Sequence, residues 1–506
     1  MAFTPSPQQQ AFFDWIVKGH GSTLIEAVAG AGKTTTLVHG VKLMQGNVFI
    51  AAYNRKIADE IKQRVEGMPN VRAGTFHSAG FTAWRRVANR VRVEAKKGYM
   101  IVDAMEAEGR MIDGWAVSGS ACGTMLKLVS LAKQSGAGFA WDIADPKPWM
   151  ELIDHHSLDT DMAVAPETAV KVAQEILTRS IAMDSDVIDF DDMIFCPLYH
   201  NVRMFQQDWL LVDEAQDTNL ARRALARKML KPGGRLVAVG DRHQAIYGFT
   251  GADADSMDLI AKDFAAAELP LTVTYRCPKA VVALAHQWVN HIQAHETAPE
   301  GRVSEVTLGD ILAKPHAMLR PTDAILCRNT KPLIELAYQL IRKGMGCTVE
   351  GRDIGQGLIA LARKWKVRSL GALADRLERF KETEMQKAIA KGQETKAQSI
   401  EDKVDTLTLI IAQTQEQGGS DINDLVASIN RLFSDDATGL LKLSTVHKSK
   451  GREWERVFIL GRSAYMPSQW ARKAWQQQQE VNLMYVAVTR AKAELVDIGL
   501  SPKAAA

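Results

Sequence analysis

Cysteine is scarce in this sequence, and long apolar runs are missing. Five cysteines occur among 506 residues, and no two have the close spacing of a zinc ribbon or an iron–sulfur site. No apolar stretch is long enough to span a membrane, and the polar segment 1–10 does not resemble a signal peptide. We therefore expect a soluble cytoplasmic protein of a reducing compartment, without a membrane partner.

An excess of charge of one sign is missing as well. The 62 basic and 59 acidic residues leave a formal net charge of +3, so any surface for nucleic acid has to be local. Hydrophobic residues make up 46% of the chain and charged residues 24%, which is ordinary for a globular protein. A chain of this length should hold about three or four domains' worth of core.

A glycine-rich turn near the N-terminus carries the strongest chemical pattern. The apolar run 22–29 leads into Gly-Ala-Gly-Lys-Thr at 30–34, and helix formers follow. This strand, loop and helix order is required for a phosphate-binding loop, in which backbone N–H groups and a helix N-terminus hold phosphates. Lys33 should reach the β- and γ-phosphates, and Thr34 should ligate Mg²⁺. Ala27 stands where the common pattern has Gly, and a fortuitous turn is the alternative interpretation.

Adjacent carboxylates follow a second buried-strand pattern. The apolar run 209–212 ends in Asp213 and Glu214. Asp213 is expected to hold Mg²⁺, and Glu214 to orient and deprotonate an attacking water. Two adjacent acids are common in loops, but behind a phosphate-binding loop they favour nucleotide hydrolysis.

Polar and aromatic residues follow a third apolar run, 236–239. Within 240–249, Gln244 is placed to sense a γ-phosphate, while Tyr247 and Phe249 could stack on bases. Aromatics two residues apart are more often one face of a core strand, but the neighbouring glycines and polar residues argue against that here. Segment 85–97 carries six basic residues and one acid, which indicates either a solvated helix face or a phosphate contact.

A second α/β pattern occupies the later part of the chain. Residues 269–275 should open it, and apolar strand patterns recur at 324–327, 440–446 and 457–460. Between them, segment 352–440 is poor in strand residues and mixed in charge, which favours a solvated helical insertion. Such a module should be dispensable for ATP turnover.

Together these motifs have a recognisable order along the chain. The sequence resembles the superfamily 1 DNA helicases of the UvrD/Rep/PcrA type, and segment 52–58 resembles the F-box helicase branch of that family. The matching segments are Thr-Phe-His-Ser at 75–78, Asp-Glu-Ala-Gln-Asp at 213–217, 240–247, Tyr275-Arg276, 445–447, 450–453 and 485–491.

The resemblance implies an α/β fold of two RecA-like P-loop NTPase domains, each with a mainly helical insertion, and ATP in the cleft between them. The first domain would comprise 1–84 and 187–270, with insertion 85–186. The second would comprise 271–351 and 441–506, with a short insertion at 352–440.

Site residues follow from the same resemblance. Gln9 would contact the adenine edge and Tyr275 the adenine face, while Glu453 would contact the sugar. The nucleotide-binding set is Gln9, Ala29, Gly30, Ala31, Gly32, Lys33, Thr34, Thr35, Tyr275, Arg276, Glu453 and Arg490. The catalytic set is Lys33, Asp213, Glu214, Gln244, Arg276 and Arg490, with both arginines reaching the γ-phosphate. The DNA-binding set is Asn54, Thr75, Phe76, His77, Tyr247, Phe249 and His447.

Some positions depart from the family pattern. Thr250 stands where an arginine is frequent, and Ala52 stands where an aromatic DNA contact is frequent. Tyr53, one position later, could substitute for that aromatic.

The implied function is an ATP-dependent DNA helicase or translocase that moves 3′→5′ along single-stranded DNA in repair, recombination or replication. Its cofactors would be ATP and Mg²⁺, and its partners single-stranded DNA and tailed duplexes; protein partners are not indicated. One alternative is a DNA-stimulated ATPase that remodels protein–DNA complexes or serves a separate nuclease. Another is a nucleic-acid-gated ATPase switch that does not travel.

Overall fold

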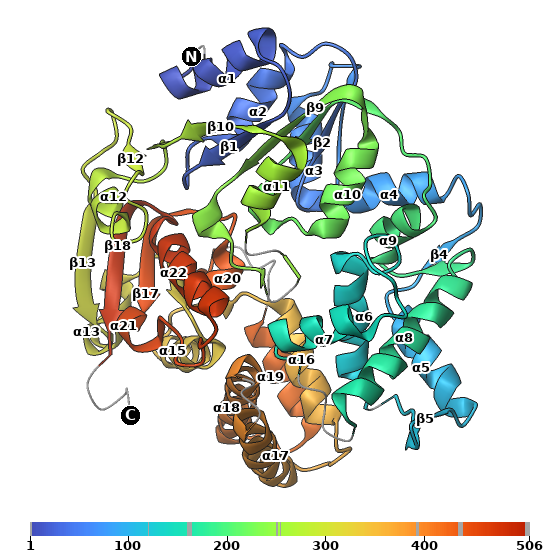
Figure 1. Ribbon diagram of the computed structural model, residues 1–506. Helices are drawn as coiled ribbons and strands as arrows, with labels where there is room; N and C mark the ends of the chain where they lie inside the picture. The colour runs from blue at the N-terminus through green and yellow to red at the C-terminus, as the bar shows by residue number, and fades with distance from the viewer. Residues whose placement is uncertain are drawn as a thin grey trace. The chain divides into compact units, whose positions relative to one another are not determined.

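The computed structural model describes residues 3–119, 121–158, 164–248, 251–252, 255–390, 394–433 and 439–500. The chain divides into two compact units, Met1–Thr272 and Val273–Ala506. In Figure 1 the first unit runs from blue to green and the second from yellow-green to red. Each unit is described by itself.

Unit 1 is built on a parallel sheet whose strand order is β10-β1-β9-β8-β2-β3. The strands are β1 (Thr23–Ala27), β2 (Val48–Ala51), β3 (Val71–Gly74), β8 (Gln207–Val212), β9 (Leu230–Gly240) and β10 (Ala267–Leu271). Their apolar side chains, such as Leu24 and Ile50, are fully buried, as expected where helices cover both faces of a parallel sheet. β1 and β8 flank β9, so the carboxyl ends of these three strands lie side by side.

Helices connect the strands of unit 1. They are α1 (Pro7–Lys18), α2 (Lys33–Val41), α3 (Arg55–Arg64), α4 (Phe76–Trp84), α9 (Asp192–Tyr199), α10 (Leu220–Met229) and α11 (Ser256–Phe264), with 3₁₀ turns η1 (Ala215–Asp217) and η2 (Arg242–Gln244). The start of α1 is fixed by a capping box, in which Gln9 N–H donates to the Ser6 hydroxyl and the Gln9 side chain accepts from Ser6 N–H.

A mainly helical segment lies between α4 and α9. It contains α5 (Lys97–Ala107), α6 (Gly123–Ser135), α7 (Pro146–His155), α8 (Pro166–Ala182), the β5–β6 hairpin (Met111–Ile112, Trp115–Ala116) and paired β4 (Arg92–Val93) and β7 (Val187–Ile188).

Segment 85–97 does not form one basic helix face. Lys97 is fully buried, and its Nζ lies 2.6 Å from Asp192 Oδ2. Lys133 pairs with the other oxygen of the same carboxylate at 2.7 Å. The expectation of a solvated or phosphate-contacting segment is therefore wrong for Lys97, which is a partner in a buried ion cluster.

Unit 2 holds a second parallel sheet in the order β13-β18-β17-β14-β16-β15. Its strands are β13 (Arg302–Thr307), β14 (Ala324–Cys327), β15 (Cys347–Val349), β16 (Leu441–Thr445), β17 (Trp454–Leu460) and β18 (Ala491–Gly499); β11 (Val273–Thr274) pairs with β12 (Gln293–Ala294). Segment 269–275 does not simply open this unit, because β10 pairs with β1 in the first sheet and only β11 belongs to unit 2.

Two groups of helices complete unit 2. Those outside segment 352–440 are α12 (Lys279–Ala285), α13 (Leu308–Ala313), α14 (Pro315–Met318), α15 (Thr330–Arg342), α20 (Val446–Ser449), α21 (Arg462–Tyr465) and α22 (Ala474–Val488). Those within it are α16 (Arg352–Arg363), α17 (Leu370–Ala390), α18 (Glu394–Glu416) and α19 (Ile422–Leu432).

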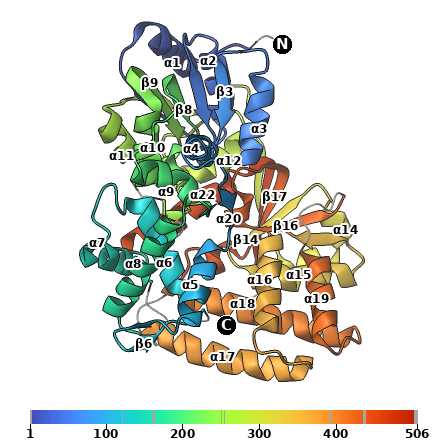
Figure 2. The same ribbon diagram turned by 90° about the vertical axis from the view of Figure 1, so that its right-hand side faces the viewer.

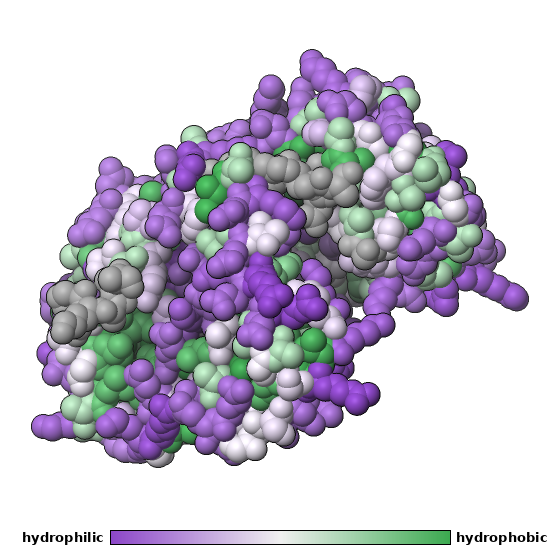
Figure 3. Space-filling model, turned by 90° about the horizontal axis from the view of Figure 1, so that it is seen from below, coloured by the Kyte–Doolittle hydropathy of each residue, from purple (hydrophilic) through white to green (hydrophobic). Residues whose placement is uncertain are grey.

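The helices of segment 352–440 are less solvated than the composition predicts. α18 packs against α15, and α17 packs on α18, so α17 is the outermost of these helices (Figure 2). Leu407 and Ile410 of α18 join one hydrophobic cluster with Ile325 and Leu443 of the sheet. More than half of the α17 residues are exposed. Figure 3 shows the molecule from the side on which α17 lies in Figure 1, and hydrophilic side chains there are interspersed with hydrophobic patches. The solvated description thus fits the outer face of α17 but not α18.

Candidate nucleotide site and nucleic-acid contacts

The predicted phosphate-binding loop connects β1 to α2. Gly30 and Gly32 have φ angles of 74° and 77°, a left-handed conformation that glycine adopts without strain. Gly32 is the N-cap of α2, and no side chain caps the helix there. Backbone N–H groups at this helix N-terminus are therefore available for phosphate oxygens.

Lys33 lies opposite the predicted acids. Its Nζ is 3.3 Å from Glu214 Oε2, and the two side chains are 12% and 20% exposed. Burial alone lowers the pKa of Lys33, but the carboxylates of Glu214, Asp241 and Asp213 outweigh burial, so the pKa is raised. Burial and the neighbouring Glu214 raise the pKa of Asp213 to about 7. The acids thus outnumber the lysine at this point, and a further cation would stabilise them.

Magnesium fits these residues. Mg²⁺ bound with a nucleotide usually takes one or two carboxylates and keeps water and phosphate oxygens as its other ligands. Within the described residues, no group of three His, Cys, Asp or Glu side chains forms a complete protein cage for a metal. Asp213 and the hydroxyl of Thr34 are the groups that would hold it.

The backbone at Glu214 is unusual. Its φ of 51° and ψ of 49° place a non-glycine residue in the left-handed region, where strain is common at functional sites. Gln216 donates through Nε2 to Glu214 Oε2 at 2.5 Å, and its Oε1 accepts from Asp241 N–H at 3.0 Å. Asp241 in turn accepts from Gln244 Nε2 at 2.7 Å. A continuous chain of hydrogen bonds therefore joins the acid pair to Gln244.

The sequence motifs assigned no role to Gln216 or Asp241, although both lie within them. Their contact depends on the adjacency of β8 and β9, which only the folded sheet reveals. Gly240 makes this contact possible, because a Cβ there would lie 2.6 Å from Gln216 Oε1. The available signal was a short polar segment after each of two apolar strand patterns, 213–217 after β8 and 241–244 after β9.

Gln9 lies beside the phosphate-binding loop. It is 3% exposed, and its Nε2 donates to Thr36 Oγ1 at 2.9 Å. A Cβ on Gly32 would lie 3.7 Å from the same nitrogen. This position is near the loop, while the contact of Gln9 with adenine stays a prediction.

Unit 2 brings most of its predicted nucleotide residues together. Arg276 Nε lies 2.5 Å from Glu453 Oε2, and its Nη1 donates to the Thr489 carbonyl at 3.4 Å. Arg490 is 1% exposed, with Nε donating to the Val486 carbonyl at 2.9 Å. Tyr275 is 47% exposed, so its ring is accessible.

Two predicted DNA contacts are helix caps. Asn54 Oδ1 accepts from Ile57 N–H at the start of α3, and Thr75 Oγ1 accepts from Ser78 N–H at the start of α4. These bonds give Asn54 and Thr75 a structural reason to be present, and a DNA contact by either stays a prediction.

Three further predicted DNA contacts are buried, in the case of Phe76, or partly buried, in the case of His77 and His447. Phe76 is 6% exposed, and its ring joins the core of unit 1. Burial, with a contribution from Arg222, lowers the pKa of His77 to about 4. Burial, followed by Arg328 and Lys450, lowers the pKa of His447 to about 3. Both histidines are therefore neutral near pH 7 and would act as hydrogen-bond partners rather than as cations.

Tyr53 and Tyr247 form a parallel aromatic pair, with ring centroids 6.0 Å apart and planes 5° apart. The Arg222 guanidinium lies 5.9 Å from the Tyr53 ring. Tyr53 also lines a small cavity together with Asp213 and Glu214, so this member of the pair lies near the acids. Phe249 and Thr250 lie outside the described residues.

Replacing either tyrosine of this pair with alanine should weaken binding of single-stranded DNA without nucleotide. A base–aromatic stack contributes about 1–3 kcal/mol, which corresponds to roughly fivefold to 150-fold in Kd. Fluorescence anisotropy with labelled oligonucleotides measures this, and Tyr53→Phe and Tyr247→Phe are matched controls that keep the ring. Unchanged DNA affinity in both alanine variants would show that the pair serves packing alone.

The fold and site define a P-loop nucleotide-binding protein with two parallel α/β units. Residues 7–265 match the UvrD/REP helicase N-terminal domain, and residues 358–499 match the UvrD-like helicase C-terminal domain. The chain belongs to the UvrD/REP helicase family. The resemblance to UvrD/Rep/PcrA-type helicases, drawn from the motifs, is thereby confirmed.

Individual relatives with helicase names are about one quarter identical to this chain. The ATP-dependent DNA helicase PcrA of Staphylococcus epidermidis is 26% identical over 335 residues, covering 60% of this chain and 42% of the relative. A probable DNA helicase II homolog of Mycoplasma pneumoniae is 26% identical over 309 residues, covering 56% and 42%. The matches thus span less than half the length of these relatives. In the described ranges, no helix is long and apolar enough to cross a lipid bilayer.

Proposed function

We propose that this protein is an ATP-dependent DNA helicase or translocase that couples ATP hydrolysis to movement along single-stranded DNA. The observation that carries the proposal is the ion pair between Lys33 and Glu214, with Asp213 next to Glu214 in the sequence. Lys33 is the first residue of α2, whose N-terminus has no side-chain cap. A phosphate cradle, a water-activating carboxylate and a metal-binding carboxylate are the parts that phosphoryl transfer to water requires. Family membership and the names of the relatives support DNA as the partner.

In this mechanism the residues mainly position groups and stabilise charge. Glu214 takes a proton from the attacking water, and Gln216 holds the Glu214 carboxylate in place. The hydrogen bonds that run from Glu214 through Gln216 and Asp241 to Gln244 couple the nucleotide site to the segment that carries Tyr247. Arg276 and Arg490 would supply positive charge to the γ-phosphate, a role that the family resemblance implies for both. Direction 3′→5′ and a role in repair, recombination or replication are part of the proposal through the family resemblance.

One assay series tests the proposal. ATP turnover should rise with single-stranded DNA, and a duplex with a 3′ tail should be unwound in preference to one with a 5′ tail. RNA and blunt duplex serve as comparison substrates. Displacement of streptavidin without strand separation would favour the remodelling alternative, and DNA-stimulated turnover without either activity would favour a switch.

Arg276→Lys should lower DNA-stimulated ATP turnover by about tenfold or more, because lysine keeps the charge but not the forked geometry of the guanidinium. The ion pair with Glu453 should survive, so the fold should be retained. Phosphate release at saturating DNA and ATP measures the effect. Arg302→Lys is the matched control, since Arg302 is an exposed residue of β13. Near wild-type turnover in Arg276→Lys would remove Arg276 from the catalytic set.

A further inference from the structure

The unit 1 sheet has a groove along one edge. β3 is the last strand in the sheet order, so no strand among the described residues pairs with its outer side. A cavity of about 570 Å³ lies at this edge. Its walls come from the end of α3, from β3, from α4 and from the segment that leads into β8.

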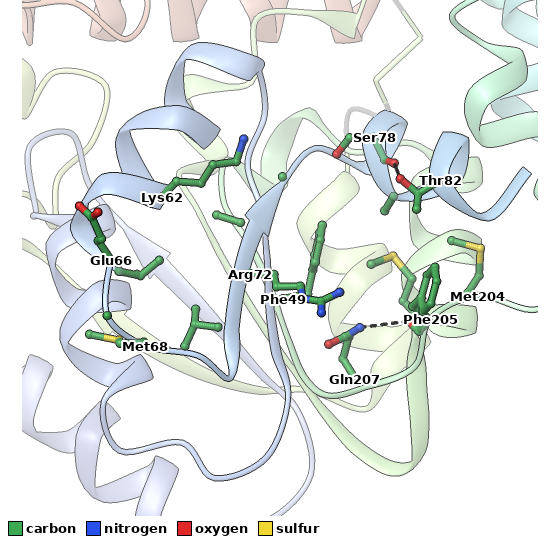
Figure 4. A pocket seen from close by; sticks show the side chains of 17 residues that line it. Phe49, Lys62, Glu66, Met68, Arg72, Ser78, Thr82, Met204, Phe205 and Gln207 are labelled. Atoms are coloured by element: carbon green, nitrogen blue, oxygen red, sulfur yellow. Dashed lines mark hydrogen bonds between the residues drawn. The ribbon is translucent and has the colours of Figure 1, made fainter. Parts of the chain in front are cut away.

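The cavity extends over both faces of β3. Figure 4 shows Lys62, Glu66 and Met68 on one side of the strand, and Phe49 and Phe205 on the other. Consecutive side chains of a strand point to opposite faces. A compact ligand would occupy one face only, whereas an extended peptide beside β3 would place alternate side chains into both halves of the cavity.

The backbone of β3 can receive such a strand. N–H groups of the β2 side donate to the carbonyls of Asn70 and Gly74, so the alternate residues Val71 and Ala73 direct their backbone groups away from β2. Val71 N–H is already bonded to the Met68 carbonyl at 3.1 Å. The Val71 carbonyl and both backbone groups of Ala73 are thus oriented toward the open edge.

The charged residues that line the cavity are Lys62, Glu66 and Arg72, and Glu66 lies on the same side of β3 as Lys62 (Figure 4). Lys62 is paired with Asp59 at 2.8 Å, and the Arg86 guanidinium lies 4.7 Å above the Phe205 ring. Arg72 is exposed, and in the described part of the chain its guanidinium has no hydrogen-bond or ion-pair partner. A carboxylate on the peptide would complement this cation.

We propose that the β3 edge binds an extended segment of another protein, which adds to the sheet as a strand. Apolar side chains of the segment enter the two halves of the cavity, against Met68 on one face and Phe205 on the other. An Asp or Glu of the segment pairs with Arg72. This inference goes beyond the proposed function and does not depend on it, because none of these residues belongs to the predicted nucleotide or DNA sets.

Selection from a displayed library of random peptides, using the full chain as target, tests the proposal. Enriched peptides should alternate apolar residues and carry an acid. With a synthetic labelled copy, Met68→Glu, Phe205→Ser and Arg72→Glu should each weaken binding by about tenfold or more. A lysine in place of the peptide's acid should restore binding to Arg72→Glu. Lys56→Glu, an exposed charge change on α3 outside the cavity, is the matched control and should have no effect.

Several results would overturn the proposal. If the selection enriches no peptide, no strand binds at this edge. The same conclusion follows if binding of the enriched peptides is weakened by only one of Met68→Glu and Phe205→Ser, which lie on opposite faces of β3. Self-association of the chain that these variants abolish would make a second copy the occupant instead.

Ala73→Pro gives a separate test of the backbone contact. It removes an outward N–H without removing a bond to β2, and peptide binding should fall by about tenfold or more. Thermal unfolding must show that this variant is folded. If Ala73→Pro is not folded, the test of strand binding rests on the variants at positions 68, 72 and 205, which are exposed or half-buried.

Discussion

Glu214→Gln is expected to lower DNA-stimulated ATP turnover by about a thousandfold, the middle of the usual range for loss of a general base, while ATP binding is largely retained. The amide cannot take a proton from water, yet it keeps the size of the side chain and its hydrogen bond with Gln216. Asp213 remains available to hold Mg²⁺. Phosphate release measures turnover, and a fluorescent ATP analogue measures binding.

Lys33→Ala is the matched comparison, because it should abolish turnover for a different reason. It removes the cation that faces the phosphates and also leaves three carboxylates without their lysine. Nucleotide binding should therefore fall together with turnover, and thermal unfolding should confirm that the variant is folded. An equal loss of nucleotide binding in Lys33→Ala and Glu214→Gln would contradict the separate roles assigned to these two residues.

The parts of this site that could be predicted are those in which chemistry and local structure lie in one short segment. The phosphate-binding loop is an example, since an apolar strand, glycines and a helix start follow one another within 22–41. The acids at 213–214 are another, because a buried strand directly precedes them. The observed β14 (Ala324–Cys327) has the bounds that its apolar run predicts.

The parts that could not be predicted depend on which segments become neighbours. The Gln216–Asp241 hydrogen bond exists because β8 and β9 are adjacent. Lys97 lies in a basic segment that is typical of a protein surface. It is nevertheless buried, because Asp192, far along the chain, supplies its counter-charge. Residues 269–275 were expected to open the second unit, but residues 269–271 belong to β10 and join the first sheet. A local pattern does not say which sheet an edge strand joins.

The stability of segment 352–440 also depends on contacts between segments that are far apart in the sequence. Mixed charge predicts a solvated module, but α18 also carries out a structural task for α15. Asp402 of α18 accepts from the N–H groups of Thr330 and Lys331 at 3.1 and 3.0 Å, where the N-cap residue Asn329 makes no side-chain cap. The first turn of α15 is therefore capped from another helix.

Replacing about residues 356–436 with a Gly/Ser linker is consequently expected to unfold unit 2, rather than to leave ATP turnover in place as the composition predicts. The linker would expose the side of the hydrophobic cluster that Leu407 and Ile410 now cover. Leu407→Ala alone should lower the free energy of unfolding by about 2–5 kcal/mol, because the residue is fully buried. Asp402→Ala should lower it by about 1 kcal/mol through loss of the cap.

Thermal and denaturant unfolding of the full chain measure these changes. Arg376→Ala, on the exposed face of α17, is the control and should change the free energy of unfolding by less than about 0.5 kcal/mol. A linker variant that is monodisperse, shows a cooperative unfolding transition and retains DNA-stimulated ATP turnover would refute this prediction. In that case the contacts of α18 with α15 would be dispensable, and the segment would be a separable module after all.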